Sequence, residues 1–109
     1  MAQKRIDNAI KKIVLKFLAM LEKDNVNIDH AFIFGSHANG YARKDSDLDI
    51  AIVSSNIHNS LASTKYLLKK AHQLDTGSYI IEPHGFHPRE FVDRNPMVWE
   101  IKTTGSKII

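Results

Sequence analysis

The stretch FGSHANGYARKDSDLDIAI, residues 34–52, contains two carboxylates, Asp47 and Asp49, one residue apart at the start of an apolar run. Residues 48–54 alternate as a strand does, with apolar side chains on both faces, which predicts a central strand of a sheet. Asp is disfavoured in such a strand, because a buried carboxylate costs free energy unless it is paired, hydrogen-bonded or bound to a metal. The pair therefore needs a physical explanation.

Alternation places Asp47 and Asp49 on the same face, with Cα atoms about 7 Å apart. Two anions at that distance repel each other, and a divalent cation beside them reverses the sign of the interaction. Mg²⁺ is typically held by one or two carboxylates together with phosphate oxygens of a substrate. A third carboxylate is usual in phosphoryl-transfer sites, and Glu82, at the end of the next expected strand, is the candidate. The structural alternative is that Asp47 begins a turn and Asp49 faces solvent.

Gly35 and Ser36 precede the two aspartates and follow the apolar run of residues 31–34. Glycine permits a sharp turn and a close approach by a ligand. If a helical turn opens at Ser36, its N–H groups form a site for phosphate. The alternative is a plain strand-to-helix turn, and no P-loop motif follows it.

The rest of the chain predicts helices and strands in alternation. Helices are expected over 3–23, over 59–74 with Asn59 or Ser60 as N-cap, over the short segment 89–94, and from Asn95–Pro96 to Gly105. Strands are expected over 31–34, 48–54 and 78–82, and a loop over 83–88. This order predicts one α/β (α+β) domain, residues 1–109, with a small mixed sheet covered by helices.

Several other residues have two interpretations. His84 and His87 have metal-ligand spacing, but Pro83 and Gly85 argue against a helix there, so loop histidines beside a site are favoured. Trp99 is expected in the core. The last two residues, Ile108 and Ile109, are expected either to pair as an edge strand or to lie in a subunit interface.

The composition limits the class of protein. The chain has 109 residues, no cysteine and a formal net charge of +3. The sequence predicts no disulfide and no thiolate zinc site, no signal peptide and no membrane-spanning segment, so a cytoplasmic protein is expected. The mild positive charge is compatible with phosphate-rich ligands but does not indicate nucleic acid.

Taken together, Gly35-Ser36, ten residues, and Asp47-Leu48-Asp49 form the pattern G-S-x10-D-x-D. This pattern resembles the nucleotidyltransferase superfamily typified by DNA polymerase beta, and above all its minimal bacterial and archaeal members. Ala38, Gly40 and Ser46 also match the family's local pattern. The stretch YIIEPHGFHPREF resembles the family segment that carries the third acid, which maps it onto Glu82, and NPMVWEIKTTG resembles the C-terminal helix.

The resemblance implies the nucleotidyltransferase fold and a catalytic site of Asp47, Asp49 and Glu82. These residues would bind Mg²⁺, and Gly35 and Ser36 would bind the triphosphate. The implied reaction moves a nucleoside monophosphate from an NTP, expected to be ATP, to an acceptor hydroxyl. The implied partner is a small helical HEPN-type protein in a toxin–antitoxin pair, with this chain as the antitoxin. A homo-oligomer is the other way to complete the acceptor site.

The sequence departs from the family in places. His37 and Asn39 stand where many members have basic residues, so Arg43 and Lys44 are the alternative phosphate contacts. The third acid is Glu rather than the commoner Asp. Two other functions stay open: a non-catalytic nucleotide- or partner-binding subunit with the same fold, and a metal nuclease.

Overall fold

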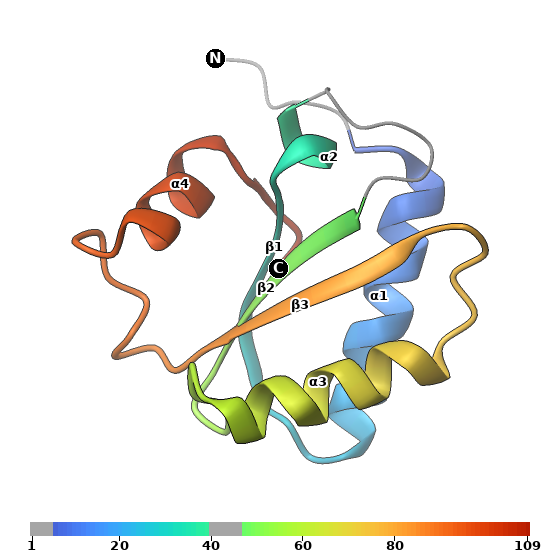
Figure 1. The fold of residues 1–109 in the computed structure, drawn as a ribbon, viewed down its shortest axis with the longest axis horizontal. Coiled ribbons are helices and arrows are strands. Elements are labelled where there is room, and N and C mark those ends of the chain that lie inside the picture. The colour runs from blue at the N-terminus through green and yellow to red at the C-terminus, as the bar shows by residue number, and fades with distance from the viewer. Residues whose placement is uncertain (1–5, 40–46) are drawn as a thin grey trace.

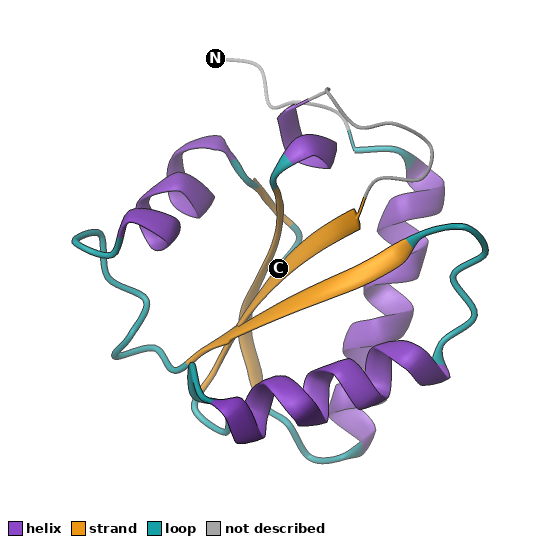
Figure 2. Ribbon diagram, viewed as in Figure 1, coloured by secondary structure: helices purple, strands orange, loops and turns teal. Residues whose placement is uncertain are grey.

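The computed structural model describes residues 6–39 and 47–109, apart from the side chains of His37 and Asn39. The motif residues Gly40 and Ser46 and the basic pair Arg43 and Lys44 therefore lie outside the described residues. The described elements follow the order α1, β1, α2, β2, α3, β3, α4, β4. The alternation of helices and strands confirms the expected fold class (Figures 1 and 2).

The centre of the fold is a four-stranded mixed sheet with the order β3-β2-β1-β4. β2 runs parallel to β3 and antiparallel to β1, and β1 runs antiparallel to β4. Strand β2, which carries both aspartates, is thus a central strand, as predicted. The bounds of the strands are β1 Ile28–Phe34, β2 Asp47–Ser54, β3 Ile80–Phe86 and β4 Ser106–Lys107.

Helices cover the two faces of the sheet unequally (Figure 1). α1 (Asn8–Lys23) and α3 (Leu61–Gln73) pack on the face formed by Leu48, Ile50 and Ile52 of β2. α4 (Pro96–Thr104) packs on the opposite face, where Val98 and Ile101 join a smaller cluster. That cluster also contains Phe34, Ala51 and Phe86. Asp49 belongs to this second face, because it alternates with Leu48 and Ile50.

The helix ends follow from local chemistry. α1 begins at Asn8, because the Asp7 side chain accepts a hydrogen bond from the Ala9 N–H and caps it; the expected start at residue 3 lies outside the described residues. Ser60 caps α3 by accepting from the Ser63 N–H, which selects it over Asn59. Asn95 caps α4 as predicted.

The third strand is longer than expected. The sequence predicts a strand that ends at Glu82, but β3 continues through Pro83, His84 and Gly85 to Phe86. In the described sheet β3 pairs with β2 alone, so it is an edge strand, and an edge strand tolerates a proline that has no N–H to donate. The predicted loop over 83–88 is therefore wrong for residues 83–86, and Glu82 lies inside the strand.

The short helix expected over 89–94 is also absent; the segment forms turns. Glu90 accepts hydrogen bonds from the N–H groups of His87 and Asn59, which hold the segment against the β2–α3 connection. Phe91 packs against Phe32 and Phe86, with ring centroids 5.5 Å apart in each pair. These tertiary contacts replace the helix that the local sequence favours.

Two expectations concern the C-terminal region. Trp99 is 57% exposed, so the prediction that it belongs to the core is wrong: Val98 and Ile101 occupy the buried positions of α4. The expectation that the last residues pair as an edge strand is confirmed. The Ile108 N–H donates to the Ala31 carbonyl at 2.8 Å, and the Ala31 N–H donates to the Ile109 carbonyl at 3.1 Å.

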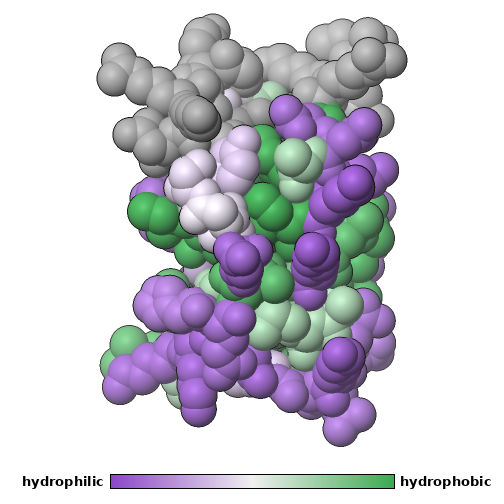
Figure 3. Space-filling model, turned by 90° about the vertical axis from the view of Figure 1, so that its right-hand side faces the viewer, coloured by the Kyte–Doolittle hydropathy of each residue, from purple (hydrophilic) through white to green (hydrophobic). Residues whose placement is uncertain are grey.

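The surface is mixed in character. The face shown in Figure 3 carries hydrophobic side chains between hydrophilic ones, as is common on globular proteins. Among the described residues, none of the helices has the length and hydrophobicity needed to span a membrane.

Gly85 fixes how closely α3 approaches the sheet. A Cβ atom at this position would lie 2.5 Å from Cγ2 of Ile57 and 3.0 Å from Cδ1 of Leu67. We expect Gly85→Ala to lower the free energy of unfolding by about 1–3 kcal/mol, because the core must shift to admit the methyl group. Urea denaturation followed by circular dichroism measures this loss, and an unchanged midpoint would contradict the close packing.

Candidate functional site

Asp49 and Glu82 are brought together by the pairing of two strands. The parallel register of β2 and β3 sets Asp49 directly opposite Glu82. On the other side of β2, Asp49 pairs with Phe34, the last residue of β1. Asp49 thus lies at the centre of the sheet, with an acid on one side and the end of β1 on the other.

The turn after β1 approaches Asp49 closely. Gly35 has a φ of +75°, a left-handed conformation that favours glycine. A Cβ atom there would lie 2.5 Å from Oδ2 of Asp49. Ser36 begins the single-turn helix α2 (Ser36–Asn39), and the Ala38 N–H bonds to the Gly35 carbonyl at 3.2 Å. Glycine is required both for the turn and for the space beside the carboxylate.

His84 joins the two acids from β3. It lies two residues after Glu82 on the same strand and therefore on the same face. Its Nε2 atom is 3.3 Å from Oδ1 of Asp49, and its ring packs edge-on against Phe34 with centroids 5.1 Å apart. The two histidines of the H-x-x-H spacing are separated by the fold, since His87 instead stacks on His58.

Asp49, Glu82 and His84 form a cluster of metal-ligating side chains. One ligand atom from each residue lies within 4.8 Å of the others. Carboxylate oxygens and imidazole nitrogen are ordinary ligands of divalent ions, so this acid cluster could hold one.

Asp47, the other predicted metal ligand, is exposed at the start of β2 and is not one of these three. It shares the face of Asp49, and its negative charge contributes to raising the pKa of Glu82. Asp47 therefore acts electrostatically on the cluster from its margin, and its role as a ligand stays a prediction.

The electrostatics of the cluster are unfavourable without a cation. Loss of hydration at the sheet surface and the negative charge of Asp49 raise the pKa of Glu82, while His84 opposes this shift. A carboxyl group with a raised pKa resists ionisation because of its surroundings. A bound cation would relieve the repulsion, so the residues present fit a metal ion.

The raised pKa gives a prediction for stability. The folded chain holds the Glu82 proton more tightly than the unfolded chain, so ionisation of Glu82 weakens the fold as pH rises through its pKa. Glu82→Gln is therefore expected to unfold at higher urea concentration than the unsubstituted protein at pH 7 in EDTA. The difference should vanish near pH 3, where both states hold the proton. A Glu82→Gln protein that is less stable at pH 7 would contradict the repulsion.

A cavity of about 250 Å³ adjoins the acid cluster along the edge of β3. Glu82 and His84 line it from the strand, Asn59 and Thr64 from the α3 side, and Met97 from α4. A group that entered this cavity would touch two members of the cluster.

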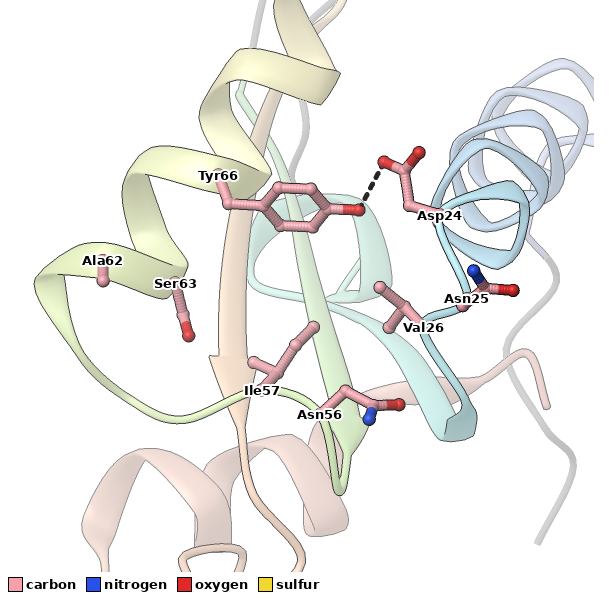
Figure 4. Close-up of a pocket in the computed structure, with 8 residues that line it drawn as sticks. All are labelled: Asp24, Asn25, Val26, Asn56, Ile57, Ala62, Ser63 and Tyr66. Carbon is pink, nitrogen blue, oxygen red and sulfur yellow. Dashed lines mark hydrogen bonds between the residues drawn. The ribbon is translucent and has the colours of Figure 1, made fainter.

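A different cavity, of about 400 Å³, opens at the opposite end of the sheet (Figure 4). Val26 precedes β1 there and Ile57 follows β2. Its one carboxylate, Asp24, accepts hydrogen bonds from Lys70 at 2.8 Å and from the Tyr66 hydroxyl at 2.7 Å, and both lower its pKa. Because this carboxylate is already paired, we take the acid cluster as the candidate site.

The structure thus brings together three of the predicted site residues, Gly35, Asp49 and Glu82, with Ser36 following at the turn. The sequence predicts His84 in a loop beside a site; His84 does lie beside the acids, but within β3 rather than in a loop. The available signal was the alternation of Glu82 and His84, which holds only if the strand passes through Pro83.

Comparisons with known proteins identify the family and the fold. Residues 16–85 match the sequence profile of the family described as "Polymerase beta, Nucleotidyltransferase", which spans more than half of the chain and includes the whole cluster. No curated protein sequence matches the chain significantly.

Two solved structures share the fold. One is a chain of the crystal structure of a toxin–antitoxin with AMP-PNP, with a TM-score of 0.62 and 21% identity. The other comes from the toxin–antitoxin MntA–HpeT with two Asp-to-Glu substitutions, with a TM-score of 0.60 and 19% identity. In both comparisons the match covers 91% of this chain and 72% of the other.

Proposed function

Since the chain belongs to the polymerase beta nucleotidyltransferase family, we propose that it transfers a nucleoside monophosphate from an NTP to an acceptor hydroxyl group. The observation that carries this proposal is the register that pairs Asp49 with Glu82 beside the Gly35 turn. In this reaction the acceptor oxygen forms a bond to the α-phosphorus and pyrophosphate leaves. ATP is the proposed nucleotide, supported by the AMP-PNP of one structure with the same fold.

Each residue of the site would have a distinct role in the transfer reaction. Asp47 and Asp49 would hold Mg²⁺, which when bound neutralises charge on the triphosphate. The backbone of Gly35 and Ser36 would position the terminal phosphates next to Asp49. Glu82 would either share a metal ion with these two or, as its raised pKa favours, accept the proton of the acceptor hydroxyl. Most of the rate enhancement would come from positioning and electrostatics.

The acceptor must come from outside this small domain. We propose a small helical HEPN-type toxin as the partner and this chain as its antitoxin. The two structures of toxin–antitoxin pairs with this fold support the proposal. A second copy of the chain is the other candidate partner. The cavity beside Glu82 and His84 offers room for the acceptor group.

Transfer of label tests the enzyme. The chain is incubated with Mg²⁺, ATP labelled at the α-phosphate and the candidate partner, and the partner is then examined for label. We expect label that disappears with EDTA and in the double variant Asp47→Ala, Asp49→Ala. Asp29→Ala, which alters an exposed acid of β1, is the matched control and should transfer normally.

The alternative is a non-catalytic subunit that binds a nucleotide or a partner. The replacement of basic family residues by His37 and Asn39 favours it. Partner binding that survives in the double variant, without transfer by the unsubstituted chain under any condition, would replace the proposed enzyme with this alternative.

A further inference from the structure

His84 adds a nitrogen ligand to a site that the family resemblance builds from oxygen alone. Because Pro83 stays within β3, the strand alternation carries His84 onto the face of Asp49 and Glu82. Its ring is held edge-on by Phe34, which limits how the imidazole can turn. The nitrogen is thus fixed beside the carboxylates by the sheet itself.

The distance between His84 and Asp49 suits two ligands of one metal ion. Nε2 and Oδ1 are 3.3 Å apart, a long hydrogen bond in the metal-free chain that an ion could replace. A tetrahedral zinc ion with ligands at about 2.0–2.1 Å spaces neighbouring ligand atoms about 3.3–3.4 Å apart. An oxygen of Glu82 lies within 4.8 Å of these two atoms, and because this side chain is exposed it can turn toward the ion as the third ligand.

We propose that His84, Asp49 and Glu82 together ligate one divalent ion, and that the site therefore prefers borderline ions such as Zn²⁺ to Mg²⁺. Imidazole nitrogen suits zinc and its neighbours, whereas Mg²⁺ selects oxygen ligands. Mg²⁺ still binds through the carboxylates, with lower affinity. The inference rests on the proposed function only in placing a metal at these acids.

A zinc site with three protein ligands keeps one position open. The Gly35 turn lies against the other carboxylate oxygen of Asp49, so a ligand on the ion would have the turn as a neighbour. A phosphate oxygen or a water molecule is the expected occupant. His84 is therefore a specificity-determining residue for the metal.

Metal binding without nucleotide tests the inference. Zn²⁺ and Mg²⁺ affinities are measured by calorimetric titration of the whole chain and of His84→Asn, with His30→Asn as the matched control. His30 is an exposed histidine of β1 that lies outside the cluster. We expect His84→Asn to weaken Zn²⁺ binding by about 10–100-fold and Mg²⁺ binding by no more than about threefold. Circular dichroism verifies that each variant is folded.

A spectroscopic measurement shows whether His84 binds the metal ion or only positions Asp49. In the ¹⁵N-histidine-labelled chain, Zn²⁺ should shift the Nε2 resonance that is missing in His84→Asn. An equal loss of Zn²⁺ and Mg²⁺ affinity, or an unchanged Nε2 resonance, would overturn the inference and leave His84 as a support for Asp49. His84→Asp, which makes the site all-oxygen, should raise the affinity for Mg²⁺ relative to Zn²⁺.

The outcome is independent of the transfer reaction. Zinc selectivity that depends on His84, without any label transfer, would retain this site and remove the proposed enzyme. Label transfer by a chain that shows no His84-dependent selectivity would retain the proposed enzyme and remove the zinc preference.

Discussion

Replacing Asp49 by asparagine is expected to reduce nucleotide transfer by on the order of 10³-fold or more, without weakening the fold. Asp49 lies at the centre of the sheet between Phe34 and Glu82, and it is the acid that contacts both the Gly35 turn and His84. The substitution keeps the shape of the side chain and removes its charge. The labelled-transfer assay measures the loss.

The stability of the same variant gives an independent check. The charge of Asp49 raises the pKa of Glu82, so removing it relieves a repulsion in the metal-free protein. The urea midpoint of Asp49→Asn in EDTA is therefore expected to equal or exceed that of the unsubstituted chain. A variant that loses activity because it unfolds would count against the assigned role. Asp29→Asn should alter neither measurement.

The second large effect is expected for Gly35→Ala. A residue other than glycine at a φ of +75° costs about 1–2 kcal/mol in backbone energy. The added methyl group would also lie 2.5 Å from Oδ2 of Asp49, so the carboxylate must move. We expect a loss of about 2–4 kcal/mol in the free energy of unfolding and no measurable transfer. Urea denaturation and the transfer assay provide the two measurements.

Gly77→Ala is a closely matched control for this substitution. Gly77 also has a left-handed φ, of +64°, but a Cβ atom there would meet nothing within 4 Å. The Gly77→Ala variant should lose only the stability that the backbone strain costs, and it should transfer the nucleotide normally. In the double variant Gly35→Ala, Asp49→Ala the contact with the carboxylate is gone, so Gly35→Ala should cost less stability in the Asp49→Ala background than in the unsubstituted chain. An equal cost of Gly35→Ala in both backgrounds would show that Gly35 and Asp49 act separately.

The raised pKa of Glu82 and the zinc preference inferred from His84 have one structural cause, the close grouping of Asp49, Glu82 and His84. Both depend on anionic and imidazole groups that a single strand pair holds within one small volume. A cation that fills this volume would stabilise the fold as well as prepare the site, because it binds the folded chain alone. The midpoint temperature of thermal unfolding of the unsubstituted chain should therefore rise with increasing Zn²⁺ concentration.

Local chemistry in the sequence determined much of this protein. The apolar run around Asp49 defined a central strand, and alternation placed Asp47 on the same face. Gly35 marked the turn, and the caps at Ser60 and Asn95 set two helix starts. Each of these depends on neighbours within a few residues, where the periodicity of side chains and the backbone rules of glycine and proline apply directly.

Only the tertiary structure decided the rest. The length of β3 depends on its pairing with β2, which continues past Pro83 because the strand lies at the sheet edge. That pairing sets Glu82 opposite Asp49 and adds His84 to the site. The exposure of Trp99 likewise depends on which residues of α4 reach the sheet. Strand register and helix packing join residues far apart in the chain, and no local pattern encodes which of them will meet.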